Sequence, residues 1–289
     1  MILICGTVPI EDLPLTLGEA RLEGEFLCVN NFKIPCTQGT AAMTGAAFCV
    51  TDYLKLDSPQ VLIVGDTGRG KGSDALYKYL IERVGVLSPD VLVLHYCLPN
   101  IALIKRLCES IRKCPKRPRM IADAGSMYGA KAAGLATEFD IFTPDPCEMG
   151  FLADPDAIHP AYINKHLFEA DGNVKKMPEL VATAYQLKSA PKLLLVKGAI
   201  DYIVREGKIV DTVSEPDVPE LEAIGGTGDT ITGMVAAFVY AGMELNEAAK
   251  ICTRVNRMAG KLAQAKVSTK VWQLISQFPV VFEQMKIRG

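Results

Sequence analysis

The sequence predicts an α/β fold with a central, mostly parallel sheet and helices on both faces of that sheet. Short runs that are apolar at every position alternate along the chain with longer segments of helical spacing. A strand without a polar face belongs to a sheet covered on both sides, and helical connections make its strands parallel. Hydrophobic residues make up 49% of the chain, enough for a sizeable core. Because such folds often reach about 250 residues as one unit, we expect residues 1–289 to form a single domain.

The apolar runs and the helical patterns follow one another in a regular order. The predicted strands cover residues 61–64, 91–94, 120–122, 141–142 and 193–196. The predicted helices cover residues 73–84, 101–111 and 230–240, where apolar side chains recur at helical spacing. Residues 202–204 and 208–213 flank Glu206-Gly207, which predicts a hairpin. Residues 1–30 show no pattern clear enough for a prediction.

Composition and charge exclude several classes of protein. The formal net charge is −2, so no broad basic surface is available and we expect no nucleic-acid partner. No segment approaches the ~20 apolar residues of a membrane span. Residues 1–10 are apolar but contain no basic residue and are followed by Glu11 and Asp12, which is not the pattern of a signal peptide.

Cysteine usage agrees with a protein of the cytoplasm, and histidine usage argues against a histidine-based metal cluster. The nine cysteines are scattered, odd in number and without a CxxC pair, which predicts reduced thiols. The histidines, His95, His159 and His166, are too few and too dispersed for a histidine-based metal cluster.

The most informative motif is GGTGDT at residues 225–230, which opens the last predicted helix. A glycine-rich turn at a helix N-terminus leaves N–H groups without partners, so we expect Gly225, Gly226, Thr227 and Gly228 to hold a phosphate. Asp229 would repel an anion that was merely bound there. Its presence is explained if it takes a proton from a hydroxyl that attacks a phosphoryl group. An ordinary glycine-rich turn remains the alternative.

A second motif, TPDPCE at residues 143–148, directly follows the strand at 141–142. Asp145 and Glu148 could hold Mg²⁺, most readily through waters, because this ion keeps much of its hydration shell. The alternative is a proline turn into a helix, with Glu148 favourable in its first turn.

Polar residues also follow two other predicted strands, at the edge where such folds bind ligands. Lys197, with Gly198 beside it, could approach a nucleotide phosphate or could be a solvated lysine before a turn. Asp123 could face the cleft or cap the next helix.

Residues 65–73 (GDTGRGKGS) nearly match a P-loop. Gly65, Gly70 and Lys71 fit the pattern, but Gly72 stands where the hydroxyl that binds Mg²⁺ should be. A glycine-rich loop that contacts substrate or phosphate is therefore favoured over a true P-loop.

The order of the C-terminal motifs, TPDPCEM, a strand with KGA, a hairpin and GGTGD, resembles the ribokinase-like superfamily. Within it, these motifs are most similar to the carbohydrate-kinase branch of ADP/ATP-dependent NAD(P)H-hydrate dehydratases, whose patterns are roughly TPHPGE, LKGA and GGTGD. The resemblance covers about residues 120–242 and is weak before residue 61.

The resemblance implies a role for each candidate residue. Asp229 matches the catalytic base, and Gly225 to Gly228 match the anion hole. Glu148 and Asp145 match the region that organises Mg²⁺. The nucleotide side comprises Lys197, Gly198, Thr227 and Asn256. The substrate side comprises Gly39, Thr40, Gly65, Asp66, Gly68 and Asp123, in the N-terminal half of the chain and its middle.

The resemblance also implies the chemistry, a transfer of phosphate from ATP or ADP to a hydroxyl of a small molecule. If the acceptor is the C6 hydroxyl of hydrated NAD(P)H, the phosphate ester eliminates and returns NAD(P)H. If it is a sugar, nucleoside or vitamin alcohol, the ester is the product.

Some departures from the dehydratase pattern keep other functions open. Asp145 and Cys147 replace the His and Gly of that pattern, and the strand–helix unit at 91–111 is a feature of vitamin kinases. The dehydratase is favoured, with a small-molecule kinase and a nucleotide-binding sensor without turnover as alternatives. Apolar residues around 272–282 could pack on the sheet or join subunits in a homo-oligomer.

Overall fold

The computed structural model describes residues 1–157 and 177–288, and the strands of these residues form one sheet. The strand order is β11-β10-β9-β8-β7-β6-β1-β5-β2-β3-β4. The six strands from β9 to β5 run parallel to one another. They are β9 (Leu193–Val196), β8 (Ile141–Phe142), β7 (Arg119–Ala122), β6 (Val91–His95), β1 (Ile2–Val8) and β5 (Gln60–Gly65). The predicted mostly parallel sheet is confirmed.

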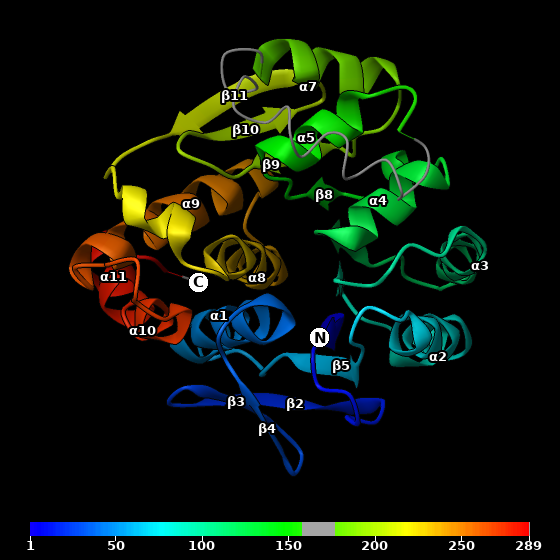
Figure 1. Cartoon of the computed structure of the whole chain (residues 1–289), viewed down its shortest axis with the longest axis horizontal. Coiled ribbons are helices and arrows are strands. Elements are labelled where there is room, and N and C mark those ends of the chain that lie inside the picture. Colours follow the sequence, from blue (N-terminus) through cyan, green and yellow to red (C-terminus); the bar gives the residue numbers. More distant parts are fainter. Residues whose placement is uncertain (158–176, 289) are drawn as a thin grey trace.

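Antiparallel strands extend the sheet at both edges. Beside β5 lie β2 (Thr16–Glu23), β3 (Phe26–Val29) and β4 (Phe32–Pro35), at the bottom of Figure 1. Beside β9 lie β10 (Asp201–Arg205) and β11 (Lys208–Val213), at the top. The turn between β10 and β11 has positive φ at Glu206 (49°) and Gly207 (83°). A two-residue turn with positive φ at both positions suits the twist of a hairpin, as predicted.

Helices cover both faces of the sheet (Figure 1). One face carries α1 (Gly39–Tyr53), α8 (Thr227–Tyr240), α9 (Leu245–Leu262), α10 (Val271–Ile275) and α11 (Phe278–Met285). The other carries α2 (Lys71–Leu87), α3 (Ile101–Arg112), α4 (Gly125–Ala132), α5 (Pro146–Ala153) and α7 (Met177–Gln186). Short 3₁₀ turns cover Ala136–Glu138 and Pro219–Ala223.

Successive residues of the central strands divide between the two cores. In β1, Ile2 and Ile4 face the core on the α1 side, whereas Leu3 and Cys5 face the core on the α2 side. Side chains alternate across a strand, so a strand buried on both faces must be apolar at every position. This explains the continuous apolar runs of the sequence.

Strand β1 is at the centre of the sheet, although its part of the chain gave no prediction. It lies between β5 and β6, and all seven of its residues are buried. The C-terminal helices α10 and α11 pack against α1 and α9, with Phe278 and Phe282 fully buried. Residues 272–282 therefore pack within the chain, but against α1 and α9 rather than on the sheet as predicted, and a subunit contact stays a prediction.

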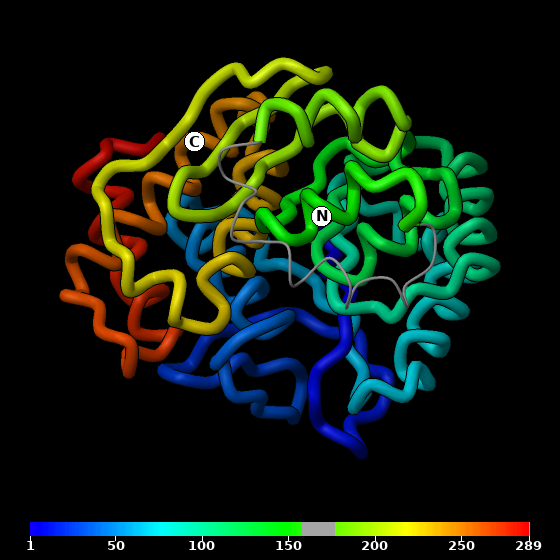
Figure 2. The backbone as a smooth tube through the Cα atoms, turned by 45° about the horizontal axis from the view of Figure 1, so that its top comes forward, coloured from blue at the N-terminus to red at the C-terminus, as the bar shows by residue number. Residues whose placement is uncertain are grey.

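Helices α1 and α8 lie side by side, although they are far apart in sequence (Figures 1 and 2). A Cβ at Gly233 of α8 would lie 2.0 Å from the carbonyl oxygen of Met43 in α1. Only glycine permits that approach. The close packing carries the N-terminus of α1 to the N-terminus of α8. Of the helices in the described ranges, none is both long and apolar enough to span a membrane.

Candidate active site

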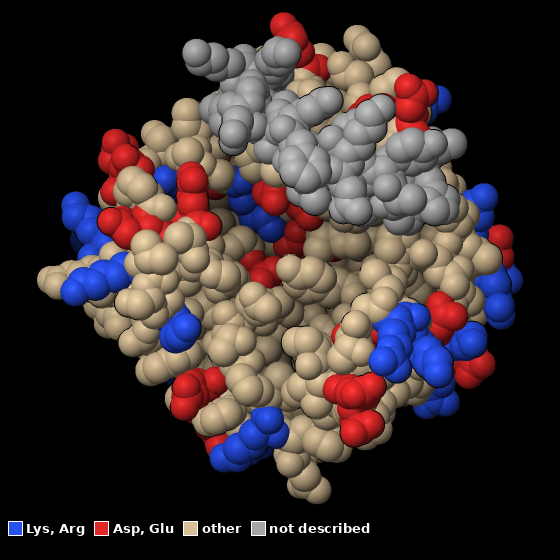
Figure 3. All heavy atoms as spheres, viewed as in Figure 1, with Lys and Arg blue, Asp and Glu red and all other residues tan. Residues whose placement is uncertain are grey.

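Three parallel strands end in charged or polar side chains at the same edge of the sheet. His95 is the last residue of β6, Asp123 follows β7, and Lys197 follows β9. The carboxyl ends of parallel strands are the usual ligand site of such folds. Figure 3 shows a hollow near the centre of the face seen in Figure 1, with acidic and basic side chains at its bottom.

Helix α8 begins at this edge, three residues earlier than predicted. Gly226 has φ of +96° and precedes the first helical residue, Thr227. Its left-handed conformation strains any other residue, which explains the glycine. The first N–H groups of a helix lack partners within it and attract anions. Gly228 lies close to Lys197, since a Cβ on this glycine would be 3.4 Å from Nζ.

Thr227 takes part in the turn that starts α8. Its N–H donates to the carbonyl of Ile224 at 3.4 Å. Its hydroxyl lies within hydrogen-bond distance of the carbonyls of Leu221 (3.0 Å) and Ile224 (3.1 Å). We predicted that Thr227 contacts the nucleotide. In the structure its hydroxyl instead stabilises the glycine-rich turn.

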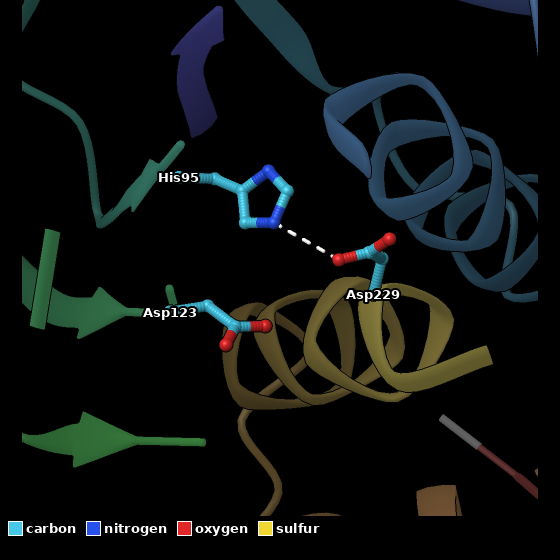
Figure 4. Close-up of side chains that lie close together, drawn as sticks. All are labelled: His95, Asp123 and Asp229. Atoms are coloured by element: carbon cyan, nitrogen blue, oxygen red, sulfur yellow. Dashed lines mark hydrogen bonds and ion pairs between the residues drawn. The ribbon is translucent and has the colours of Figure 1, made fainter. Parts of the chain in front are cut away.

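Asp229 projects from the first turn of α8 toward β6 and α1. Its Oδ2 accepts a hydrogen bond from the N–H of Gly39 at 2.6 Å, and its Oδ1 lies 3.0 Å from Nε2 of His95 (Figure 4). Burial raises the pKa of this carboxyl, but the hydrogen bond and charge of His95, the charge of Lys197 and the Gly39 N–H together hold the pKa below its usual value of 3.8. Asp229 is therefore ionised at neutral pH, as a base must be.

His95 connects Asp229 to α1 and β1. The ring is fully buried, and its Nδ1 lies 3.0 Å from the hydroxyl of Thr40. That hydroxyl donates to the carbonyl of Thr7 at 2.8 Å. Thr40, predicted to contact substrate, is itself buried and reaches the site through His95.

A buried ion pair lies beside Asp229. Nζ of Lys197 is 2.8 Å from Oδ2 of Asp123, and the same oxygen accepts a hydrogen bond from Thr232 of α8 at 2.7 Å. Burial lowers the pKa of Lys197, but the carboxylates of Asp123, Glu148 and Asp229 outweigh this effect and raise it. The lysine is therefore a fixed positive charge and not a solvated side chain before a turn.

Arg257 of α9 fastens the backbone that follows Lys197. Its guanidinium donates to Oδ2 of Asp201 at 2.8 Å and to the carbonyls of Gly198 (2.8 Å) and Ala199 (2.9 Å). The neighbouring Asn256 accepts a hydrogen bond from the hydroxyl of Thr230 in α8 at 3.0 Å. Helix α9 thus braces both segments predicted to face the nucleotide.

The glycine-rich loop at 65–73 does not form a phosphate cradle. Oδ1 of Asp66 accepts from the N–H groups of Gly68, Arg69 and Gly70 at 2.9–3.1 Å. Oδ2 accepts from the N–H and hydroxyl of Ser73. The loop amides that would bind a phosphate in a P-loop are thus occupied by the protein's own carboxylate. The P-loop alternative is wrong.

The other substrate candidates in this loop, Gly65 and Gly68, also have structural roles. The N–H of Gly65 donates to the carbonyl of Leu13, and a Cβ on Gly65 would lie 1.9 Å from the carbonyl oxygen of Ile10. Gly68, with φ of +91°, forms the exposed tip. Asp66 and Gly65 are thus used to build the loop, and contact of the loop with substrate stays a prediction.

Asp145 and Glu148 form a capping box at the start of α5. Oδ1 of Asp145 accepts from the N–H of Glu148 at 2.7 Å, and Oε2 of Glu148 accepts from the N–H of Asp145 at 2.9 Å. Tyr128 donates to Oε1 of Glu148 at 3.1 Å. The structural alternative for this motif, a proline turn into a helix, is therefore confirmed.

The same acids can also serve a hydrated cation. Burial and the nearby carboxylates of Asp145 and Asp123 raise the pKa of Glu148, because the negative charges are close together. Carboxylate oxygens with lone pairs to spare are the donors that Mg²⁺ prefers. The donor set therefore fits Mg²⁺ held through waters.

A second group of possible metal ligands was not predicted. His95, Asp123 and Asp229 offer ligand atoms within 4.8 Å of one another. The ammonium of Lys197 already neutralises Asp123, so this group does not need a cation for charge balance. His159 and His166 lie outside the described residues.

Sequence reasoning missed His95 and Tyr96, at the end of β6. Tyr96 has φ of +49°, is half-exposed and stands edge-on to the His95 ring, with 4.3 Å between the ring centroids. Ala124, next to Asp123, has φ of +51°. Positive φ also occurs in ordinary turns of this chain, such as Glu206, but Tyr96 and Ala124 directly follow two side chains of the site. His95 and Tyr96 stand at the end of an apolar strand, which is the sequence feature that identified Asp123. The same feature could have identified them as candidate site residues.

Comparison with known families supports the resemblance stated above. Residues 81–278 match the model of a carbohydrate-kinase family described as NAD(P)H-hydrate dehydratase. An uncharacterized protein of Methanocaldococcus jannaschii is 37% identical over 83% of this chain and 98% of its own length. The ADP-dependent (S)-NAD(P)H-hydrate dehydratase of Xanthomonas campestris pv. campestris is 25% identical over 87% of this chain and 80% of its own.

Solved structures with the same fold include a dehydratase and a kinase. The ADP/ATP-dependent NAD(P)H-hydrate dehydratase of Bacillus subtilis, crystallised with ATP and Mg²⁺, matches with a TM-score of 0.53 and 15% identity over 98% of this chain and 89% of that one. The pyridoxal kinase of Entamoeba histolytica matches with a TM-score of 0.54 and 14% identity over 97% and 95%. At such identities the likeness establishes the ribokinase-like fold alone.

Proposed function

The chain belongs to the NAD(P)H-hydrate dehydratase family of carbohydrate kinases, and on this premise we propose that it repairs hydrated NAD(P)H with ATP or ADP as phosphoryl donor. The observation that carries the proposal is Asp229, an ionised carboxylate at the N-terminus of a glycine-capped helix. A site that only bound phosphate would gain nothing from an acid in this position.

The proposed reaction has two steps. The proton of the substrate hydroxyl passes to Asp229 as the hydroxyl oxygen forms a bond to the terminal phosphorus of the nucleotide. The bond from that phosphorus to its bridging oxygen breaks, and the shortened nucleotide leaves. The C–O bond of the phosphate ester then breaks, the adjacent carbon loses a proton, and the ring double bond of NAD(P)H is restored.

Residues around Asp229 are suited to stabilising charge in the first step. The N–H groups at the start of α8 and the ammonium of Lys197 are fixed donors near the carboxylate. Preorganised donors of this kind usually make the largest contribution to catalysis. Asp145 and Glu148 would hold Mg²⁺ through waters, and the bound ion supplies charge neutralisation at phosphate oxygens.

The family match favours the dehydratase over the other functions considered. A sensor without turnover has no use for the ionised Asp229. A small-molecule kinase shares the first step of the reaction, so only the product separates it from the dehydratase.

The test is recovery of the 340 nm absorbance of NADH from its hydrate, with enzyme, Mg²⁺ and either ATP or ADP. Nucleotide-dependent recovery that is lost in Asp229→Asn supports the proposal. An enzyme that binds nucleotide but restores no absorbance contradicts it, and a panel of alcohols would then identify a kinase substrate.

A further inference from the structure

The imidazole of His95 is enclosed by protein groups on both of its nitrogens. Nε2 faces Oδ1 of Asp229 and Nδ1 faces the hydroxyl of Thr40, each at 3.0 Å (Figure 4 shows the first of these). The ring has no solvent exposure. Its protonation is therefore determined by what these two partners can donate and accept.

The Thr40 side fixes one proton. The carbonyl of Thr7 can only accept, so the single hydroxyl proton of Thr40 points to it, at 2.8 Å. The Thr40 oxygen must then accept from His95, and Nδ1 carries a hydrogen. If the hydroxyl turned to the ring instead, the buried Thr7 carbonyl would lose this partner, which is unfavourable.

The Asp229 side fixes the other proton. An ionised carboxylate only accepts, so the short contact with Nε2 needs a hydrogen on that nitrogen. A neutral ring with its proton on Nδ1 would set two lone pairs against each other at 3.0 Å. The arrangement is satisfied when both nitrogens carry protons and the ring is an imidazolium.

We propose that His95 is a positioning residue that donates from both ring nitrogens, to Thr40 and to the base Asp229, and so pairs with Asp229 as an imidazolium. The inference rests on the proposed function, in which Asp229 takes the substrate proton. His95 holds Oδ1 and the Gly39 N–H holds Oδ2, so the carboxylate is fixed in one orientation.

The pair also explains how an acid can occupy a phosphate site. The positive ring offsets the charge of Asp229, so an incoming polyphosphate meets a neutral pair. Beside it lie Asp123 after β7 and Lys197 after β9, which neutralise each other, and the carboxyl of Glu148 in α5 also acts on Lys197. Tyr96 contributes an uncharged ring edge. Two ion pairs therefore lie side by side beneath the proposed transfer site.

The first experiment compares the pH profiles of kcat/KM for the wild type and His95→Gln. Glutamine keeps an N–H donor but carries no charge, so the acidic limb due to Asp229 should move up by about 1 pH unit or more. At pH 7 the variant should lose about 10- to 100-fold in kcat, the size of loss found when the hydrogen-bond partner that orients a metal-binding histidine or carboxylate is removed. A uniform loss without a shift would mean a purely structural role and would overturn the proposal.

A second variant guards against misfolding of the first. Thr40→Val preserves shape but removes the oxygen that accepts from Nδ1. It should move the acidic limb in the same direction by a smaller amount. An unchanged limb in both variants overturns the proposal.

The second experiment does not depend on turnover. Nitrogen-15 NMR of the imidazole rings distinguishes a doubly protonated ring from a neutral one, and the signal that disappears in His95→Gln identifies His95. We expect both nitrogens protonated at pH 7 in the wild type and a neutral ring in Asp229→Asn. A neutral His95 in the wild type refutes the pair even if the enzyme is active. Absence of dehydratase activity with an imidazolium present would instead refute the proposed function.

Discussion

Lys197 and Asp123 follow strands β9 and β7 and meet with 2.8 Å between Nζ and Oδ2, where both side chains are almost completely buried. Thr232 of α8 donates to the same carboxylate oxygen. The pair therefore joins two strand ends to the helix that bears Asp229. A buried charge is tolerated only with such partners.

Lys197→Met should destabilise the protein by about 3–5 kcal/mol, because it leaves the buried Asp123 without its counter-ion. The double variant Lys197→Met/Asp123→Asn should recover much of this loss, since the asparagine is neutral and can still accept from Thr232. Urea unfolding at pH 7 measures both. A loss below about 1 kcal/mol, the size found for exposed pairs, would contradict the role given to this pair.

Asp229→Asn should lower kcat by at least ~100-fold, because the amide cannot accept the substrate proton. Nucleotide affinity, measured by calorimetry, should persist, since the N–H groups at the start of α8 remain. Asp217→Asn is a suitable control, because it makes the same change at an exposed position. Similar rates for Asp229→Asn and the wild type would exclude Asp229 as the base.

Strand positions and their polar ends could be predicted from the sequence because they follow simple rules. A buried parallel strand is apolar throughout, and the residue after it reaches the ligand edge, which identified Asp123 and Lys197. β1 obeys the same rule only over Ile2–Cys5, because Gly6 and Thr7 interrupt its apolar run, and this short pattern gave no prediction. Its central place follows from pairing with β5 and β6, which are distant in sequence.

The partners of the site residues could not be predicted, because they depend on long-range packing. Gly39 and Asp229 are 190 positions apart and meet only because α1 packs against α8. His95 was treated as one of a few dispersed histidines, and its contact with Asp229 likewise crosses 134 positions. The loop at 65–73 shows that a local pattern can also mislead. It resembled a phosphate site, but its N–H groups donate to the carboxylate of Asp66 within the same loop.

Asp66→Asn should destabilise the loop at 65–73. It should also remove the pH dependence that the Asp66 carboxyl gives to the free energy of unfolding. Burial raises the pKa of Asp66, but the N–H groups of Ser73, Gly70 and Arg69 outweigh it and hold the pKa below its usual 3.8. A carboxyl whose pKa is lowered on folding stabilises the protein at pH values above the pKa that this carboxyl has in the unfolded chain. This contribution is lost as the pH falls below about 3.8. Thermal unfolding between pH 3 and 7 should therefore show a steeper acid loss for the wild type than for the variant.

Lys71→Ala should leave turnover unchanged, in contrast to the lysine of a P-loop. Lys71 is exposed at the start of α2, and the loop before it is closed on Asp66. Phosphoryl transfer measured at saturating nucleotide checks this expectation. Loss of turnover in Lys71→Ala, with Asp229→Asn active, would restore the P-loop hypothesis.

Glu148→Gln should separate the structural role of this side chain from its role toward a cation. Glutamine preserves the capping box with Asp145 but removes the charge. Burial, and then the carboxylates of Asp145 and Asp123, raise the pKa of Glu148 from 4.5 to about 8. A carboxyl with a raised pKa makes the folded state bind more protons, so stability falls as the pH rises from about 4.5 to about 8. The variant should lack this fall and should melt at a higher temperature than the metal-free wild type at pH 8.

Mg²⁺ should relieve the same charge repulsion, so it should raise the melting temperature of the wild type more than that of Glu148→Gln. Thermal unfolding with MgCl₂, against KCl of equal ionic strength, isolates the specific effect of the ion from screening. Glu179→Gln, the same change at an exposed position in the first turn of α7, is the matched control and should respond as the wild type does. An equal Mg²⁺ response in Glu148→Gln and the wild type would mean that the capping box at Asp145 and Glu148 serves α5 alone and that the cation is held elsewhere.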